Sequence, residues 1–382
     1  MSRSPYSLWT LTRQRPLALL AGLAVVLTGC LPSSQKQNTR ALTPADSAAT
    51  AIAEAVPADS LVEVWTAPIG DRAFAPTGLA WVQPDSGAAA RLAVIETRDG
   101  AIHLLSARGD SVGTWPLAEG SFPYLAGTLG DTVAVFARGV PEIQWVTAAG
   151  VVRRMETPEE ASAALVESGR TVVRVGGGPS DASAALVRLS ASGAETSRHP
   201  IAVDWRASGY VRAWGDSVLA LSGYRPVADV LTPEASGGAV LDTLAFTGFD
   251  SPQLVRSYQF MIGEVDEPPL LTSGARALGD RLFVLNVRTE RVRVDVYDRA
   301  GRLVRVLQGP IPTDPDGRPQ VLDVYPADLA VREAASGAVE VAVLLQRPRG
   351  IIQQADARVV LFRWTPPADA SPEVPATPEA DA

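Results

Sequence analysis

A short turn recurs along the chain and limits the fold more than any other feature of the sequence. In each copy, a small polar residue is followed three positions later by glycine. The copies are Ser106–Gly109, Thr147–Gly150, Ser190–Gly193 and Asp298–Gly301, and a looser version ends at Gly238. Hairpin loops of this length need a residue with positive φ, which glycine adopts without steric cost. The glycines follow one another at intervals of 41, 43, 45 and 63 residues, a spacing that indicates a repeated structural unit.

Strand-like segments flank each of these turns. Before Gly301, the segment Val292–Tyr297 alternates apolar and polar residues, and 302–307 follows the glycine as a second such segment. Alternation with a period of two, rich in valine, predicts β-strands. Upstream, Gly-Asp pairs precede near-continuous apolar runs, which are typical of strands packed on both faces. These pairs begin at Gly130, Gly215 and Gly279. Each repeat therefore predicts four strands, and helical periodicity is confined to about Thr157–Glu167.

Four-stranded units with a period of about 40–50 residues are typical of a β-propeller. Outer strands are predicted after the glycines, at 110–117, 150–157, 194–201, 239–246 and 302–308. In the sixth unit, the third strand is predicted at Arg358–Trp364. A proline- and alanine-rich stretch follows it, instead of an outer strand. We expect Leu61–Ala67 to supply that strand, so that the N-terminal strand closes an all-β ring of six four-stranded antiparallel blades. An array of β-sandwiches or another blade number is the alternative.

Over residues 60–365, the chain resembles the six-bladed β-propeller lipoproteins of bacterial envelopes, relatives of the NHL and TolB-like propellers. The resemblance rests on the blade turns and not on a catalytic motif. It implies a propeller fold and an envelope location, and it implies no particular activity.

The N-terminus has the features of an export signal. Three arginines form a basic leader, and residues 16–29 form an uncharged apolar run of 14 residues. That length suits a signal-peptide core and is short for a membrane-spanning helix. The run ends in Leu-Thr-Gly-Cys at 27–30, which resembles the bacterial lipobox. We therefore expect cleavage before Cys30 and its modification with diacylglycerol and fatty acid, such as palmitate. An ordinary secretory signal with a cysteine there by chance is the alternative.

Composition sets the expected boundaries on either side of the propeller. Residues 1–29 are predicted to be the lipoprotein signal peptide, 30–59 a lipidated disordered tether, 60–365 the propeller, and 366–382 a disordered acidic tail. The tether has no aromatic residue and little apolar surface to offset its ordering entropy. A short helical turn within 47–55 is the only regular structure expected there.

The anchor also bears on localisation and partners. Leu31 follows Cys30, whereas an aspartate at that position retains lipoproteins at the inner membrane of well-studied enterobacteria. We therefore expect anchoring in the cell envelope, at the outer membrane rather than the inner one. The net charge is −8, and Lys36 is the only lysine among 34 basic residues, which argues against nucleic acid as a partner. With Cys30 acylated, no disulfide is available.

No arrangement of residues in the sequence indicates catalysis, a metal or a cofactor. His103 and His199, the two histidines, lie far apart with no carboxylate at a metal-ligand spacing. No nucleophile-elbow motif is present. Asp314 and Asp316 precede a glycine as in half of a calcium loop, but no bidentate Glu follows at the required distance. We therefore predict no catalytic residue, no metal and no cofactor.

The arginines leave the choice between a scaffold and an enzyme open. Arg291, Arg293, Arg302 and Arg305 alternate with apolar residues in the fifth unit and are predicted to form a solvated strand face. Tryptophans recur in the strands and are expected in the core. Several carboxylates or arginines converging on the axis would favour an enzyme, whereas small and apolar side chains there would favour a scaffold.

Two connections between units are longer than the others and are predicted to emerge on one face of the ring. They span 247–271 and 309–325. The candidate binding residues within them are Tyr258, Phe260, Asp266, Glu267, Asp314, Arg318 and Tyr325. Mixed aromatic and charged loops on a rigid scaffold are typical of a recognition surface. We therefore predict a non-catalytic binding or scaffold protein with an envelope protein or glycan as its partner. A propeller hydrolase or lyase with a site at the mouth of the axial channel is the alternative.

Overall fold

The computed structural model describes most of the chain between residues 44 and 367. The described ranges are 44–69, 75–84, 87–118, 120–176, 184–201, 209–234, 238–266, 269–288, 291–311, 325–347 and 356–367. The predicted signal peptide, Cys30 and most of the predicted acidic tail lie outside them, as do Glu267, Asp314 and Arg318. Neither helix in this part of the chain is long and apolar enough to cross a membrane.

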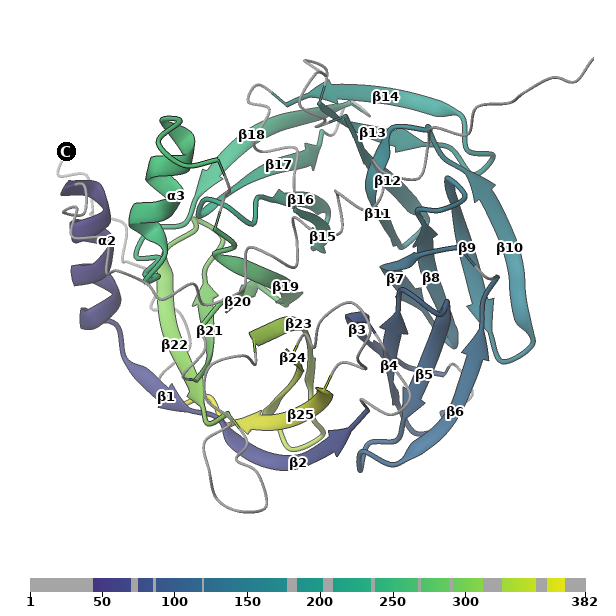
Figure 1. Ribbon diagram of the computed structural model, residues 1–382, viewed down its shortest axis with the longest axis horizontal. Helices are drawn as coiled ribbons and strands as arrows, with labels where there is room; N and C mark the ends of the chain where they lie inside the picture. The colour runs from purple at the N-terminus through teal and green to yellow at the C-terminus, as the bar shows by residue number, and fades with distance from the viewer. Residues whose placement is uncertain are drawn as a thin grey trace, which may run out of the picture.

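Six sheets form a closed ring (Figure 1), which confirms the predicted six-bladed propeller. Blade one contains β3 (Pro76–Val82), β4 (Arg91–Glu96), β5 (Ala101–Leu105) and β6 (Ser111–Pro116). Blade two contains β7 (Pro123–Leu129), β8 (Thr132–Ala137), β9 (Glu142–Thr147) and β10 (Gly150–Glu156). Blade three contains β11 (Ala161–Glu167), β12 (Arg170–Val175), β13 (Ala185–Leu189) and β14 (Glu195–Pro200).

The other three blades follow the same order from the inner to the outer strand. Blade four contains β15 (Tyr210–Trp214), β16 (Ser217–Leu221), β17 (Val227–Pro233) and β18 (Ala239–Ala245). Blade five contains β19 (Thr272–Leu278), β20 (Arg281–Asn286), β21 (Val292–Tyr297) and β22 (Leu303–Gly309). Blade six contains β23 (Tyr325–Glu333), β24 (Val339–Arg347) and β25 (Asp356–Trp364). The predicted outer strands are therefore confirmed to within a residue or two.

The glycine turns and the ring closure also agree with the predictions. Gly109, Gly150, Gly193 and Gly301 all have positive φ, between 73° and 99°. The N-terminal strand β2 (Val62–Pro68) pairs antiparallel with β25 and completes blade six. The core within the described ranges consists of six apolar clusters, one at each interface between neighbouring blades.

Within the predicted tether, residues 44–60 form more regular structure than the helical turn expected within 47–55. They form the helix α2 (Pro44–Ala55) and the strand β1 (Ala58–Ser60), which lie along the outer side of β22 (Figure 1). β1 pairs parallel with β22 as a fifth strand of blade five, and Ala53 packs into the apolar cluster between blades four and five. The segment needs no core of its own, because the propeller supplies a free strand edge and an apolar surface. Segment composition reports neither of these.

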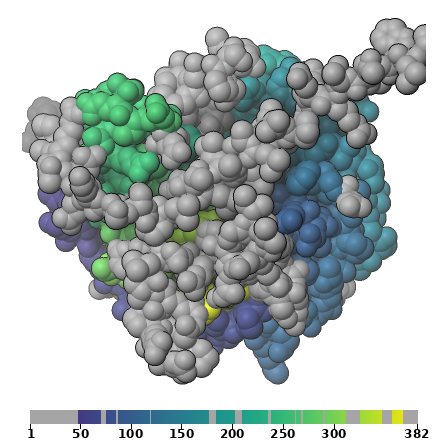
Figure 2. Space-filling view, in the orientation of Figure 1, coloured from purple at the N-terminus to yellow at the C-terminus, as the bar shows by residue number. Residues whose placement is uncertain are grey.

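Two further elements differ from the sequence-based expectation. The stretch with helical periodicity, Thr157–Glu167, contains the inner strand β11, because its small residues pack equally well on a sheet. The helix α3 (Leu254–Met261) was not predicted and lies in the connection from blade four to blade five. It stands on the face of the ring turned toward the viewer in Figure 2.

Candidate functional site

The inner strands surround the axis of the ring (Figure 1), and polar side chains of these strands contact one another there. We call this group the axial arginine cluster. Its members are Arg174, Tyr210, Arg212, Thr272, Arg276 and Asp328. They come from β12 in blade three and from the inner strands β15, β19 and β23 of blades four, five and six. No two members from different blades are close in sequence, so sequence patterns could not have shown that they meet.

Asp328 is the carboxylate at the centre of the cluster. Its side chain is 2% exposed, and its Oδ2 accepts hydrogen bonds from Arg276 Nη2 at 2.8 Å and from the backbone N–H of Leu79 at 3.0 Å. The same Arg276 nitrogen donates to the carbonyl oxygen of Leu79 at 2.8 Å. Asp328 therefore joins the inner strands of blades five, six and one, and charge-assisted hydrogen bonds of this kind are among the stronger ones in proteins.

A β-bulge places Asp328 near the axis. The inner strands of blades one, two, three, five and six each have a register shift, which in blade two lies closer to the hairpin. The residues after the shift are Gly78, Gly127, Ala163, Gly274 and Asp328. Bulges redirect side chains, and blade six uses the position for a charge where the other four carry glycine or alanine. An alignment of the blades would have singled out Asp328.

Gly274 provides the space that this carboxylate occupies. A Cβ atom at position 274 would lie 2.4 Å from Asp328 Oδ1, well inside van der Waals contact. The glycine of blade five and the aspartate of blade six are therefore complementary neighbours.

Arg212 reaches the same carboxylate from blade four but is only partly satisfied by it. Its Nη2 lies 3.9 Å from Asp328 Oδ1, and its Nη1 donates to the carbonyl of Val211 at 2.9 Å. Its Nε is buried without a hydrogen-bond partner. The side chains of Arg212 and Arg276 are 14% and 15% exposed. Neither arginine side chain is therefore completely buried.

Tyr210 and Arg174 extend the cluster toward blade three. The hydroxyl of Tyr210 donates to Thr272 Oγ1 at 3.1 Å, and the Arg212 guanidinium lies 5.0 Å from the centre of the Tyr210 ring. Arg174 is completely buried, and its Nη2 donates a long hydrogen bond of 3.4 Å to the carbonyl of Leu221 in blade four.

Burial sets the protonation states of the cluster. It lowers the pKa of Arg174 to about 10, an effect that the Asp229 carboxylate partly offsets. Burial also lowers the pKa of Arg212 to about 10, and the neighbouring Arg276 cation adds to the shift. Burial raises the pKa of Tyr210 to about 12. At neutral pH both arginines are therefore charged and the tyrosine is neutral, so the cluster offers positive charge and hydrogen-bond donors.

The sequence-predicted binding residues lie elsewhere. Tyr258 and Phe260 are half-buried on α3 (green in Figure 2), and the Phe260 ring lies 6.1 Å from that of Tyr224. Asp266 is exposed after α3, whereas Tyr325 begins β23 in another blade. Tyr258 and Phe260 thus share one helix, and the single recognition face that includes Tyr325 stays a prediction.

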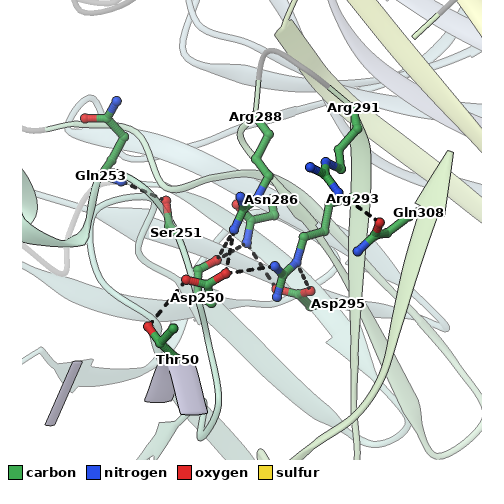
Figure 3. Close-up of polar contacts among 10 residues, drawn as sticks. All are labelled: Thr50, Asp250, Ser251, Gln253, Asn286, Arg288, Arg291, Arg293, Asp295 and Gln308. Atoms are coloured by element: carbon green, nitrogen blue, oxygen red, sulfur yellow. Dashed lines mark hydrogen bonds and ion pairs between the residues drawn. The ribbon is translucent and has the colours of Figure 1, made fainter. Parts of the chain in front are cut away.

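A second polar network fastens α2 and the start of the α3 connection to blade five (Figure 3). Asp250 Oδ2 accepts hydrogen bonds from Arg288 Nη2 at 2.7 Å and from Arg293 Nη1 at 2.9 Å. Its Oδ1 accepts a long hydrogen bond of 3.5 Å from Thr50 on α2. Arg293 Nε in turn donates to Asp295 Oδ1 at 2.7 Å. The two cations face two carboxylates, so this network is balanced.

The same network corrects the predicted solvated arginine face. Arg291 and Arg302 are exposed and Arg305 is half-buried, but Arg293 is 7% exposed. Alternation along β21 shows on which face of the strand Arg293 lies, but not whether that face meets solvent or a buried carboxylate. Here the connection that carries Asp250 covers the strand.

The two histidines occupy unremarkable positions on their blades. His103 on β5 shares a hydrogen bond with Thr114, and His199 on β14 shares one with Ser197. In the described ranges, no three His, Cys, Asp or Glu side chains gather as a metal-binding group.

The chain matches no protein-family model and no curated relative. Among solved structures, it is similar to regucalcin, a calcium-binding protein from Agrobacterium tumefaciens strain C58, with a TM-score of 0.48 and 12% identity over 81% of this chain and 96% of that one. A streptogramin B lyase gives a TM-score of 0.45 and 10% identity, covering 79% and 88% of the two chains. Virginiamycin B lyase from Staphylococcus aureus gives 0.44 and 10%, covering 78% and 99%. At these values the similarity carries no argument about ligand or activity.

Proposed function

We propose that this chain is an exported, lipid-anchored β-propeller that binds a carboxylate-bearing ligand at the axial arginine cluster. The observation that carries the proposal is the convergence of Arg212 and Arg276, from two blades, on the single carboxylate of Asp328. A buried pair of guanidinium groups with one counter-ion leaves positive charge and free donors at the axis. Guanidinium groups of this kind bind carboxylates with two parallel hydrogen bonds.

Binding fits this cluster better than proton transfer does. General acid–base catalysis needs a group whose pKa lies near the working pH. Tyr210, Arg174 and Arg212 have pKa values of about 12, 10 and 10, so each keeps one protonation state at neutral pH. A hydrolase or lyase is the second candidate, because arginines from two blades converge at the axis.

The experiment for the axial site compares carboxylate binding by the wild type and by Arg212→Gln. Titration with succinate, followed by calorimetry at constant ionic strength, should show binding that the variant weakens at least about tenfold, the effect of losing a charged hydrogen bond. Arg302→Gln removes an exposed arginine paired with Asp298 and should bind succinate like the wild type. Equal affinities of the wild type and Arg212→Gln would contradict the proposal. NMR spectra of the ligand that show conversion to product would favour the enzyme.

Anchoring and the partner are tested separately. Cys30→Ser should abolish metabolic labelling with a fatty-acid analogue, because serine offers no thiol for the thioether. Label that persists in this variant would contradict the lipoprotein assignment. Fractionation of the labelled envelope then tests the proposed outer-membrane location. The proposed partner is an envelope protein or glycan that presents the carboxylate, and pull-down with the wild type against Arg212→Gln tests it.

A further inference from the structure

The two carboxylate oxygens of Asp328 differ in their hydrogen bonding. Oδ2 accepts hydrogen bonds from Arg276 at 2.8 Å and from the backbone N–H of Leu79 at 3.0 Å. Oδ1 is buried and has no hydrogen-bond partner among the described residues. The whole side chain is 2% exposed. A buried acceptor without a partner is uncommon in native proteins and calls for a specific explanation.

Arg212 turns an equally incomplete edge toward this oxygen. Its Nη1 donates to the carbonyl of Val211, but its Nε is buried without a partner among the described residues. Its Nη2 lies 3.9 Å from Asp328 Oδ1, which makes an ion pair but is too long for a hydrogen bond. Nε and Nη2 form one edge of the guanidinium plane. With the same edge, Arg198 holds both carboxylate oxygens of Glu195.

The gap between Arg212 Nη2 and Asp328 Oδ1 suits one bridging oxygen. An oxygen about 2.8 Å from each atom can bridge their separation of 3.9 Å. It must accept a hydrogen bond from the guanidinium and donate one to the carboxylate. Water and hydroxyl groups do both, whereas an ammonium group only donates and an ionised carboxylate only accepts.

Gly274 keeps side-chain atoms away from the same oxygen. A Cβ atom at this position would lie 2.4 Å from Asp328 Oδ1 and 3.2 Å from the Asp328 Cα. A residue with a side chain at position 274 would therefore displace the oxygen that faces Arg212.

We infer that the axial site takes 2-hydroxy carboxylates. The ligand carboxylate accepts a hydrogen bond from Arg212 Nε, and its 2-hydroxyl accepts one from Nη2 and donates one to Asp328 Oδ1. The hydroxyl lies next to the carboxylate in the ligand, as Nη2 lies next to Nε in the arginine, so one small ligand serves all three unpaired groups. The inference rests on the proposed carboxylate binding, and it adds Asp328 Oδ1 as the group that recognises the hydroxyl.

The test compares ligands of nearly the same shape on the folded wild-type protein. Malate is succinate with an added 2-hydroxyl, and aspartate carries a 2-ammonium group in its place. Calorimetric titrations at constant ionic strength should show that one enantiomer of malate binds at least about tenfold more tightly than succinate, the effect of one hydrogen bond to a charged group. Aspartate should bind no more tightly than succinate, because its ammonium group cannot accept a hydrogen bond from Arg212.

A matched pair of glycine variants tests the role of Asp328 Oδ1. Gly274→Ala places a Cβ against this oxygen and should bring the ratio of the malate affinity to the succinate affinity close to one. Gly113→Ala adds a Cβ that meets nothing within 4 Å and should keep the wild-type ratio. The wild-type titrations decide the inference even if Gly274→Ala does not fold.

The outcomes distinguish this inference from the proposed function. Equal affinities of the wild type for succinate and both malate enantiomers would overturn the hydroxyl recognition and leave carboxylate binding intact. Aspartate that binds as tightly as malate, or an unchanged ratio in folded Gly274→Ala, would overturn it in the same way. Failure of succinate, malate and aspartate alike to bind the wild type would overturn the proposed function itself.

Discussion

The two halves of the ring surround one axis with different side chains. In blades one to three, the inner strands β3, β7 and β11 carry no charged residue before Glu167 at the end of β11. In blades four to six, the inner strands carry Arg212, Arg276 and Asp328. Five of the six inner strands contain a bulge. The difference therefore comes from side chains placed on a common backbone.

The N-terminal segment covers mainly the charged half, and Trp65 on β2 also donates a hydrogen bond to the carbonyl of Ala107 in blade one. β1 adds a strand to blade five, β2 closes blade six, and α2 packs at the interface of blades four and five. Buried charges destabilise a fold, and proteins commonly keep such strain at functional sites while other contacts offset it. We conclude that blades one to three act as a scaffold. Blades four to six carry the candidate site, together with the N-terminal contacts that offset the destabilising effect of its buried charges.

The largest expected effect is the loss of ring closure. Deleting residues 61–68 removes β2, exposes the edge of β25 and takes Leu61 and Ala67 from two apolar clusters. Exposed strand edges promote aggregation, so we expect this variant to unfold or aggregate, as judged by size-exclusion chromatography and circular dichroism. Deleting 31–43 should leave the melting temperature unchanged. Similar melting curves for the two deletions would refute the closure.

The next largest effect concerns the charge at the centre of the site. Asp328→Asn preserves shape but leaves Arg212 and Arg276 without their shared carboxylate, which should lower the free energy of unfolding by about 3–5 kcal/mol. The matched control is Asp298→Asn, which breaks the ion pair with the exposed Arg302, keeps an oxygen for the backbone N–H groups of the turn, and should cost at most about 1 kcal/mol. Urea denaturation measures both. Equal costs would mean that the axial carboxylate is no more important than a surface one.

A smaller effect tests whether the N-terminal helix supports the charged half. Deleting residues 44–57 removes α2, whose Ile52 and Ala53 contact blade five and its connection. From the apolar surface lost, we expect a decrease of about 2–3 kcal/mol in the free energy of unfolding. Hydrogen exchange should increase at blade five and not at blade two. A uniform increase, or none, would contradict the compensation described above.

The smallest effect probes the fit between Gly274 and Asp328. Gly274→Ala places a Cβ against the Asp328 carboxylate and should cost about 1–2 kcal/mol and weaken succinate binding. The control is Gly113→Ala on β6, where an added Cβ meets nothing within 4 Å. We expect that change to stay within about 0.5 kcal/mol, as for most surface substitutions. A silent Gly274→Ala would show that the carboxylate has room to move and that the bulge does not hold it in place.

Predictability from sequence differs between these features. The glycine turns ending at Gly109 and Gly301 located the blades because positive φ is a local requirement that the residue type reveals. Arg293 was assigned to solvent because alternation reports which face of a strand a side chain occupies but not what covers that face. Of α2 only a helical turn within 47–55 was predicted, because the surface that stabilises the full helix belongs to the propeller. The repeat itself held one unused signal, the aspartate of blade six at a position occupied elsewhere by glycine or alanine.

The sequence by itself determined the blade count, the strand order within each blade and the closure by Leu61–Ala67, since each depends on local turn chemistry and on period-two alternation. The meeting of Arg174, Arg212, Arg276 and Asp328 was decided only by the tertiary structure. These residues are far apart in the chain. Arg212, Arg276 and Asp328 become neighbours because closing a ring brings all inner strands to one axis, and Arg174 on β12 reaches blade four across the interface of blades three and four. The burial of these charged side chains results from packing between blades, and the sequence of a single blade does not contain that information.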